Sequence, residues 1–280
     1  MYPPFRRVSL LGMVAVLSLC FAILAQTALA QVPTPAHVVV VIEENHGYSQ
    51  IIGSSQAPYI NTLATQGALF IKSYALTHPS QPNYLGLFSG STQGITDDSC
   101  PHTFSAQSLE SELIAARKTF VGYPRGCPPL VQPSVHQGYT RESTLRGRTS
   151  PRTTAVIISP SPASLPVSQN YRRLHGWFQI WMMTCTTEPS SKQDSWLQTN
   201  LMAYVTWAKN NNSLLIVQWD EDQGTTTNHI ATIFVGPMGK PGKYSETINH
   251  YNILRTIEDM YGLAHLGSSA GAKPITDVWK

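Results

Sequence analysis

The chain has 280 residues, a net charge of +3 and a low share of charged side chains, 12%. The positive charge is local, because residues 124–193 hold eight Lys or Arg and two Glu, a net of +6, which leaves −3 for the rest. A nucleic-acid-binding protein needs its basic residues clustered on an ordered face, so this distribution argues against one. The length suits one large α/β domain.

The first 30 residues are typical of a secretory signal peptide. Two arginines precede an apolar run over residues 8–24, and Ala28 and Ala30 form an A-x-A cleavage site. A membrane anchor is the alternative, but no other long apolar segment follows. We therefore expect export to the periplasm or the extracellular space, no permanent membrane anchor, and a single domain over residues 31–280.

Hydrophobic periodicity predicts strands that alternate with helices. Continuous β-branched runs are typical of strands buried on both faces, and a 3.6-residue period is typical of helices. In chain order the predicted elements are a strand over 37–42, helices over 57–66, 108–118 and 196–209, strands over 214–219 and 230–235, and a helix over 247–261. This alternation predicts a doubly wound α/β sheet.

Residues 124–193 interrupt this order, since they are rich in Pro, Ser, Thr and Arg and contain no Asp. The segment is either a disordered insertion or a stretch translated in the wrong frame. The codons of residues 181–183 (Trp-Met-Met) are fixed by the genetic code. When these bases and the first two bases of the Thr184 codon are read one base out of step, they spell three aspartates. The bases that follow allow Met-His-Asp-Gly. We favour a frameshift that opens near Pro124 and closes near Asp194, which predicts a poorly structured segment.

Acidic and amide side chains follow two of the predicted strands. Glu44 and Asn45 come after the first strand, and Asp220 and Glu221 come directly after the strand over 214–219. Ligands of open α/β sheets bind beyond the carboxyl ends of the strands. Gathered carboxylates repel one another unless a cation offsets the charge, and oxygen ligands suit a hard divalent cation. The alternatives are a solvated turn capped by Asn45 and a plain acidic turn.

A hydroxyl-bearing motif lies between these acids. Residues 77–84 read Thr-His-Pro-Ser-Gln-Pro-Asn-Tyr, and Ser80 lies at a predicted helix start, where free backbone amides can hold a phosphate. A nearby cation would lower the pKa of the Ser80 hydroxyl and make it a nucleophile. Alternatively, Ser80 only caps the helix.

As a set, these motifs resemble the bacterial phosphoesterase family of the alkaline phosphatase superfamily, which includes acid phosphatases and phospholipases C. The residues that carry the resemblance are 42–46, 78–84 and 219–222, within matching regions over 36–123 and 194–280. The resemblance implies an alkaline-phosphatase-like α/β fold with a mostly parallel sheet and helices on both faces. It makes residues 31–280 a single phosphoesterase domain.

The resemblance also implies residue roles. Ser80 would attack phosphorus and form a phosphoserine, Asn83 would contact phosphate, and His250 would contact substrate or metal unless it is a core or capping histidine. The implied ligands of a divalent metal ion, of unknown identity, are Glu44, Asn45, Ser80, Asp220 and Glu221.

The implied substrate is a small phosphorylated molecule or a phospholipid head group. An acid phosphatase acting on phosphate monoesters is the favoured activity. The alternatives are a phospholipase C-like phosphodiesterase and an inactive secreted binding protein.

The chain departs from the family in its middle. The family has a central Asp-x-x-His type of segment, which resembles the out-of-frame Asp-Asp-Asp-Met-His-Asp-Gly. With the sequence as it stands, one acid and histidine group of the site is missing, and we expect crossover helices and a central strand to be missing too.

Overall fold

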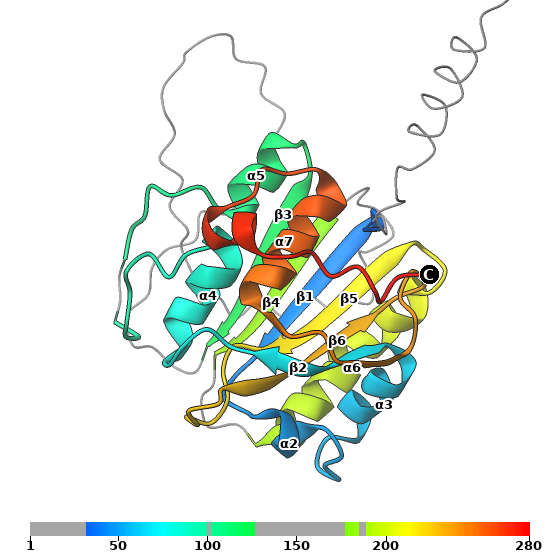
Figure 1. Ribbon diagram of the computed structural model, residues 1–280. Helices are drawn as coiled ribbons and strands as arrows, with labels where there is room; N and C mark the ends of the chain where they lie inside the picture. The colour runs from blue at the N-terminus through cyan, green and yellow to red at the C-terminus, as the bar shows by residue number, and fades with distance from the viewer. Residues whose placement is uncertain (1–31, 100–101, 127–176, 185–188) are drawn as a thin grey trace, which may run out of the picture. The chain divides into compact units, whose positions relative to one another are not determined.

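The fold is built around a sheet with β1 near its centre (Figure 1). The computed structural model describes residues 32–99, 102–126, 177–184 and 189–280. The strands are β1 (His37–Glu43), β2 (Ala68–Tyr74), β3 (Thr119–Gly126), β4 (Trp177–Thr184), β5 (Ser213–Trp219), β6 (His229–Val235), β7 (Gly242–Tyr244) and β8 (Ile248–Asn249). Their order is β3-β4-β1-β5-β6-β2-β7, and β8 pairs with β2.

Most strand pairs are parallel. β3, β4, β1 and β5 run in one direction, and β2 is parallel to β7 and β8. β6 is antiparallel to both of its neighbours, β5 and β2. The mostly parallel sheet expected from the sequence is confirmed.

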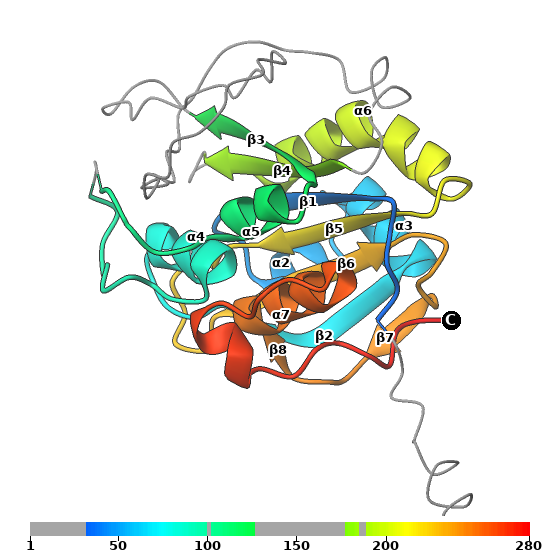
Figure 2. The same ribbon diagram turned by 90° about the horizontal axis from the view of Figure 1, so that it is seen from above.

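Helices cover both faces of the sheet (Figure 2). They are α2 (Tyr48–Ile51), α3 (Pro58–Gln66), α4 (Ser80–Ser89), α5 (Leu109–Ala115), α6 (Ser190–Ala208) and α7 (His250–Tyr261), with a 3₁₀ turn η1 (Gly267–Gly271). Side chains alternate along β1, so that Val40 packs with α4, α5 and α7 while Val41 packs with α2, α3 and α6. Among the described helices none has the length and apolar character needed to cross a membrane.

The predicted elements are present with shifted ends. The helix expected over 247–261 begins at His250, because Ile248–Asn249 form β8 and the Asn249 side chain caps α7 by accepting from the Tyr251 N–H. β2 was not predicted. It follows α3 after the single residue Gly67, and its pattern mixes buried residues with the exposed Lys72.

The expectation of a poorly structured chain over 124–193 falls mostly on residues outside the described ones and stays a prediction, while the described parts of this segment form regular elements. Residues 124–126 end β3, residues 177–184 form β4, and α6 begins at Ser190. The central strand expected to be missing is therefore present as β4, between β3 and β1. It can form there because strand pairing uses backbone N–H and C=O groups, which every residue except Pro supplies in full. Residues 1–31, 127–176 and 185–188, with the expected signal peptide, lie outside the described residues.

Candidate active site

The adjacent parallel strands β1 and β5 deliver the two acidic groups to one edge of the sheet. The Asp220 N–H donates to the Glu43 carbonyl at 2.9 Å, and the Asn45 N–H donates to Asp220 Oδ1 at 3.1 Å. Asn45 has a φ of +56°, a left-handed conformation that Asn tolerates better than most residues. The structure thus brings the residues that follow β1 and β5 together at one edge of the sheet.

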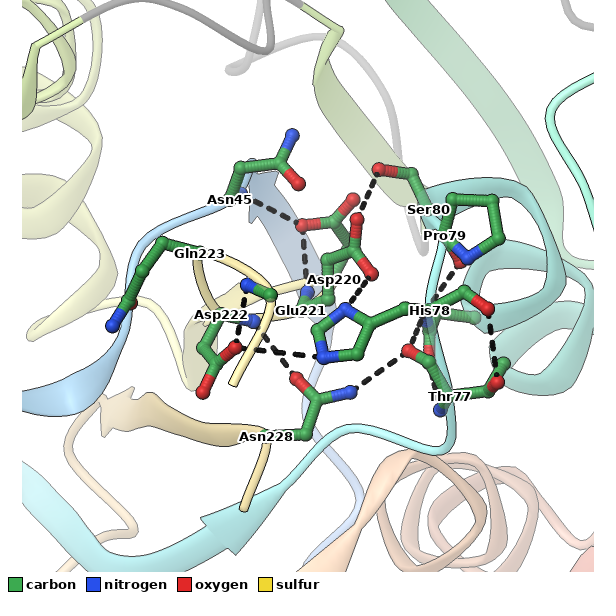
Figure 3. A network of polar contacts seen from close by, with 12 residues as sticks. Asn45, Thr77, His78, Pro79, Ser80, Asp220, Glu221, Asp222, Gln223 and Asn228 are labelled. Atoms are coloured by element: carbon green, nitrogen blue, oxygen red, sulfur yellow. Dashed lines mark hydrogen bonds and ion pairs between the residues drawn. The ribbon is translucent and has the colours of Figure 1, made fainter. Parts of the chain in front are cut away.

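Ser80, the first residue of α4, reaches the same place from a third element (Figure 3). Its hydroxyl donates to Glu221 Oε1 at 3.1 Å, across 141 positions of sequence. The other oxygen of Glu221 accepts from His78 Nδ1 at 2.5 Å. Glu221 therefore joins the Ser80 hydroxyl to an imidazole.

His78 has acceptors at both ring nitrogens, since Nε2 lies 2.9 Å from the Thr225 carbonyl oxygen. Burial lowers the pKa of His78, but the hydrogen bonds to Thr225 and Glu221 and the charges of Glu221 and Asp222 outweigh it and raise the pKa. A protonated ring is the form that can donate to both partners. The surroundings of His78 therefore favour a positive charge next to Glu221.

The carboxyl groups of the site are buried against one another. Burial, with the charge of Asp220, raises the pKa of Glu44 to about 9, although a hydrogen bond from Tyr84 lowers it. Burial raises the pKa of Asp220 to about 7, against hydrogen bonds from the N–H groups of Asn45 and Glu221. Burial also raises the pKa of Glu221. A cation placed between these carboxyl groups would stabilise their ionised forms.

Two carboxylate oxygens are available as ligands for such a cation. Glu44 Oε2 and Asp220 Oδ2 are buried and have no hydrogen-bond partner among the described residues. Asn45 and Ser80 add an amide and a hydroxyl oxygen, and together these donors fit one side of an oxygen-lined divalent site. Within the described ranges, no group of three or more His, Cys, Asp and Glu side chains is arranged so that it could hold a metal ion.

The chain matches the Phosphoesterase family over residues 54–264. It belongs to that family. A phosphatidylinositol-3-phosphatase of Mycobacterium tuberculosis is 41% identical over 286 residues, which cover 98% of this chain and 94% of the relative. An acid phosphatase of Aspergillus fumigatus is 24% identical over 235 residues, which cover 73% of this chain and 51% of the relative. The chain is accordingly a phosphoric ester hydrolase by family, as its motifs suggested.

The fold of this phosphoesterase is similar to the folds of solved structures from other organisms. A superfamily member from Vibrio parahaemolyticus has a TM-score of 0.54 at 12% identity, covering 86% of this chain and 71% of its own. The phosphonate monoester hydrolase of Agrobacterium radiobacter has a TM-score of 0.56 at 12% identity, covering 88% and 79%. At such identities the likeness concerns the fold alone, and it agrees with the expected alkaline-phosphatase-like architecture.

The Asn83 side chain of the phosphoesterase makes other contacts than the expected one with phosphate. Its side chain is buried, and Oδ1 accepts from the N–H groups of Leu76 and Thr77 while Nδ2 donates to the carbonyls of Thr77 and Pro79. These four bonds use the full capacity of an amide side chain. In this structure Asn83 shapes the loop that carries Ser80 and has no donor left for a phosphate.

His250 is likewise placed behind the site. It is 1% exposed, and its Nε2 lies 2.7 Å from the Asp220 carbonyl oxygen. Burial lowers the pKa of His250 to about 4. A neutral ring at this depth supports the backbone of Asp220, which agrees with the alternative of a core histidine more than with substrate contact. Its Nδ1 has no hydrogen-bond partner among the described residues.

The first turn of α4 offers fewer free amides than expected. The Gln81 N–H donates to Asp98 Oδ1 at 2.8 Å, and Pro82 has no N–H. An exposed carboxylate thus occupies a position where a phosphate oxygen was expected. The difference arises because residues 91–99, for which the sequence predicted no element, return to the start of α4.

Sequence reasoning missed three residues of the site. His78 and Tyr84 lie inside the motif over 77–84 but were given no role, although Tyr84 donates to Glu44 Oε1 at 2.7 Å. Gln193 donates to the Glu44 carbonyl at 3.0 Å and accepts from Trp219 Nε1 at 3.1 Å. Gln193 falls at the end of the segment assigned to a frameshift, so no sequence signal pointed to it.

Proposed function

We propose that this phosphoesterase is an exported, metal-dependent phosphatase that hydrolyses phosphate monoesters through a phosphoserine on Ser80. The hydrogen bond from Ser80 to Glu221, beside the buried carboxyls of Glu44 and Asp220, is the observation that carries the proposal. A hydroxyl at a helix start, held against acids that need a cation, is the arrangement in which a serine can be activated.

The reaction would proceed in two displacements. Ser80 Oγ attacks phosphorus while Glu221 accepts its proton, the bond from phosphorus to the ester oxygen breaks, and that proton goes to the leaving alcohol. Water then attacks the phosphoserine, which releases inorganic phosphate and restores the Ser80 hydroxyl.

A divalent cation held by Glu44, Asn45, Ser80, Asp220 and Glu221 would supply positive charge that favours the ionised Ser80 oxygen and the equatorial phosphoryl oxygens. The described residues supply the donors of one side of that site.

Both relatives are named as phosphatases, which supports a monoester substrate. The 41% identity to a phosphatidylinositol-3-phosphatase supports a phosphorylated lipid head group as one such substrate. A phospholipase C-like phosphodiesterase using the same Ser80 is the second candidate. An inactive secreted binding protein is the third, and it is favoured if residues 124–193 are genuine.

The nucleophile is tested by trapping. The chain and a frame-corrected version are mixed with p-nitrophenyl phosphate and Mn²⁺, quenched with acid, and digested for mass spectrometry. Phosphate is expected on the Ser80 peptide of the frame-corrected protein. Ser80→Ala is expected to abolish it and to lower kcat by roughly three or more orders of magnitude.

Thr77→Ala is the matched control, because the Thr77 hydroxyl already donates to the His78 carbonyl at 3.1 Å and should be dispensable for attack. Phosphate on Thr77 or on a histidine, with Ser80→Ala still active, would overturn the assignment. Comparing p-nitrophenyl phosphate and phosphatidylinositol 3-phosphate with phosphatidylcholine separates a phosphatase from a phospholipase C. The chain with its present middle segment is expected to be weakly active or inactive.

A further inference from the structure

We infer that His78 is a positioning residue that holds Glu221 in the orientation in which it receives the Ser80 hydroxyl. The inference deepens the proposed function and rests on Ser80 being the nucleophile. It concerns a contact that the motif itself does not reveal, since His78 and Glu221 are 143 positions apart.

Each of the two carboxylate oxygens of Glu221 has a different hydrogen-bond partner. Oε1 accepts from Ser80 Oγ at 3.1 Å, and Oε2 accepts from His78 Nδ1 at 2.5 Å (Figure 3). Among the hydrogen bonds of the described residues, these two are the ones that fix the Glu221 carboxylate. Without His78, the hydrogen bond from the hydroxyl that is to react would be the one left to the Glu221 carboxylate among the described residues.

His78 is itself fixed from the far side. Its Nε2 lies 2.9 Å from the Thr225 carbonyl oxygen and 3.5 Å from Asp222 Oδ1. Both ring nitrogens therefore face protein acceptors, and neither is left to donate to a leaving group. This arrangement assigns His78 to positioning and not to general acid catalysis.

A second contact ties the same two loops without touching Glu221. Asn228 donates to the Thr77 carbonyl at 2.8 Å and accepts from the Asp222 N–H at 2.8 Å. The loop of Ser80 and the loop of Glu221 therefore have a tie other than His78. Loss of the imidazole should release the carboxylate while the loops stay together.

A carboxylate on a long side chain loses alignment when a partner is removed, because several side-chain torsions become free. Removing a group that orients a metal ligand or catalytic carboxylate typically costs 10–100-fold in affinity or activity, by analogy with outer-shell residues. A loss on that scale in kcat, with little change in KM, is expected here.

Two substitutions separate positioning from loop tying. In His78→Asn the amide nitrogen takes the place of Nδ1 and keeps the donor to Glu221. In His78→Gln the amide nitrogen takes the place of Nε2 and keeps only the donor to Thr225. We expect His78→Asn to retain kcat within a few-fold of the wild type and His78→Gln to lose about 10–100-fold. A purely structural role predicts that both lose activity in step with their unfolding temperatures.

His265→Gln is the matched control, since His265 has the same side-chain exposure of 33% and also contacts a carboxylate, Asp259, at 2.7 Å. Its kcat should not change. Asn228→Gly removes the second tie between the loops. This variant should have a lower unfolding temperature and a kcat close to that of the wild type.

Crystal structures of the two His78 variants decide the inference independently of turnover. Glu221 should keep its contact with Ser80 in His78→Asn and lose it in His78→Gln. If Glu221 stays against Ser80 in both, the inference is wrong, whatever the activity. If the frame-corrected wild type forms no phosphoserine while Glu221 moves as expected, it is the proposed function that fails and not the positioning role.

Discussion

The Tyr84 hydroxyl donates to Glu44 Oε1 at 2.7 Å, which joins the second turn of α4 to the end of β1. This bond leaves Glu44 Oε2 as the free oxygen, and it opposes the burial that raises the pKa of Glu44 to about 9. The tyrosine thereby keeps a buried carboxyl closer to its ionised form.

Tyr84→Phe should therefore weaken the binding of a divalent cation. The ring still packs, but Glu44 loses the donor that favours its charged form, and a loss of about 10-fold in Mn²⁺ affinity at neutral pH is expected. Isothermal titration calorimetry measures it. Tyr204→Phe is the control, because its hydroxyl is also buried but donates to the Leu214 carbonyl. Equal affinities for the two variants would contradict the role of Tyr84.

Asp220→Asn should remove cation binding while the fold remains. The amide oxygen can still accept from the N–H groups of Asn45 and Glu221, which donate to Asp220 Oδ1 at 3.1 and 2.7 Å. Only the charge and one potential ligand oxygen are lost, so excess Mn²⁺ should restore part of the activity. The comparison is Asp194→Asn, a buried carboxylate that accepts from the Ile60 N–H at 2.8 Å. If both variants keep wild-type Mn²⁺ affinity, the proposed cation site is misplaced.

The metal-free protein should lose stability as the pH rises through neutrality. The folded pKa values of Asp220 and Glu44 are about 7 and about 9, above their ordinary values of 3.8 and 4.5. The folded state therefore binds these protons more tightly, so stability is full below the unfolded pKa values and is lost as the pH rises through the folded ones. His250 acts in the opposite sense, but only between about 4 and its ordinary 6.5.

Urea unfolding at about pH 7 and about pH 9, with and without Mn²⁺, measures the effect in a window free of His250. The loss between the two pH values should be clear without metal and small with it, since a bound cation compensates the ionised carboxyls. A protein that is equally stable at the two pH values without metal would show that these carboxyls are already ionised at neutral pH.

Gly90 should tolerate no side chain. It ends α4 with a φ of +68°, and an added Cβ would lie 1.8 Å from the Leu266 carbonyl oxygen. Gly262 ends α7 with a φ of +63° and has nothing within 4 Å of such a Cβ. Gly262→Ala should cost roughly 1 kcal/mol, the left-handed penalty alone. Gly90→Ala should cost about 2–4 kcal/mol, since a backbone shift is added. Similar urea midpoints for the two variants would contradict this reading.

The middle segment is tested at the level of the gene. Sequencing genomic DNA across codons 120–196 should reveal two compensating changes of reading frame. Tryptic peptides of the cellular protein should then match the corrected frame, with an Asp-Asp-Asp run in place of residues 181–184. Peptides that match residues 124–193 as they stand would establish the segment as genuine and favour the inactive binding protein.

The sequence predicts the two strands that position the acidic residues of the site, because a strand buried on both faces is a continuous apolar run. The strands over 37–42 and 214–219 could be read in this way, and the acids that follow them fall at one edge of a parallel sheet by geometry. The contacts of His78, Tyr84 and Gln193 could not be read, since each joins residues 40 or more positions apart. The occupation of the Gln81 amide by Asp98 depends on the path of a loop, which no periodicity encodes.

β4 pairs through its backbone with β3 over residues 177–184 and with β1 over residues 178–182, and it ends on the same edge of the sheet as Glu44 and Asp220. Backbone pairing does not distinguish Trp-Met-Met from a run of aspartates, so the same sheet can form whichever frame is read. A change of reading frame in β4 would therefore change the side chains at this edge of the sheet while the strand pairing stays the same. Screens that sort variants of this chain by solubility or by secretion would then retain catalytically dead molecules, and only turnover would distinguish them.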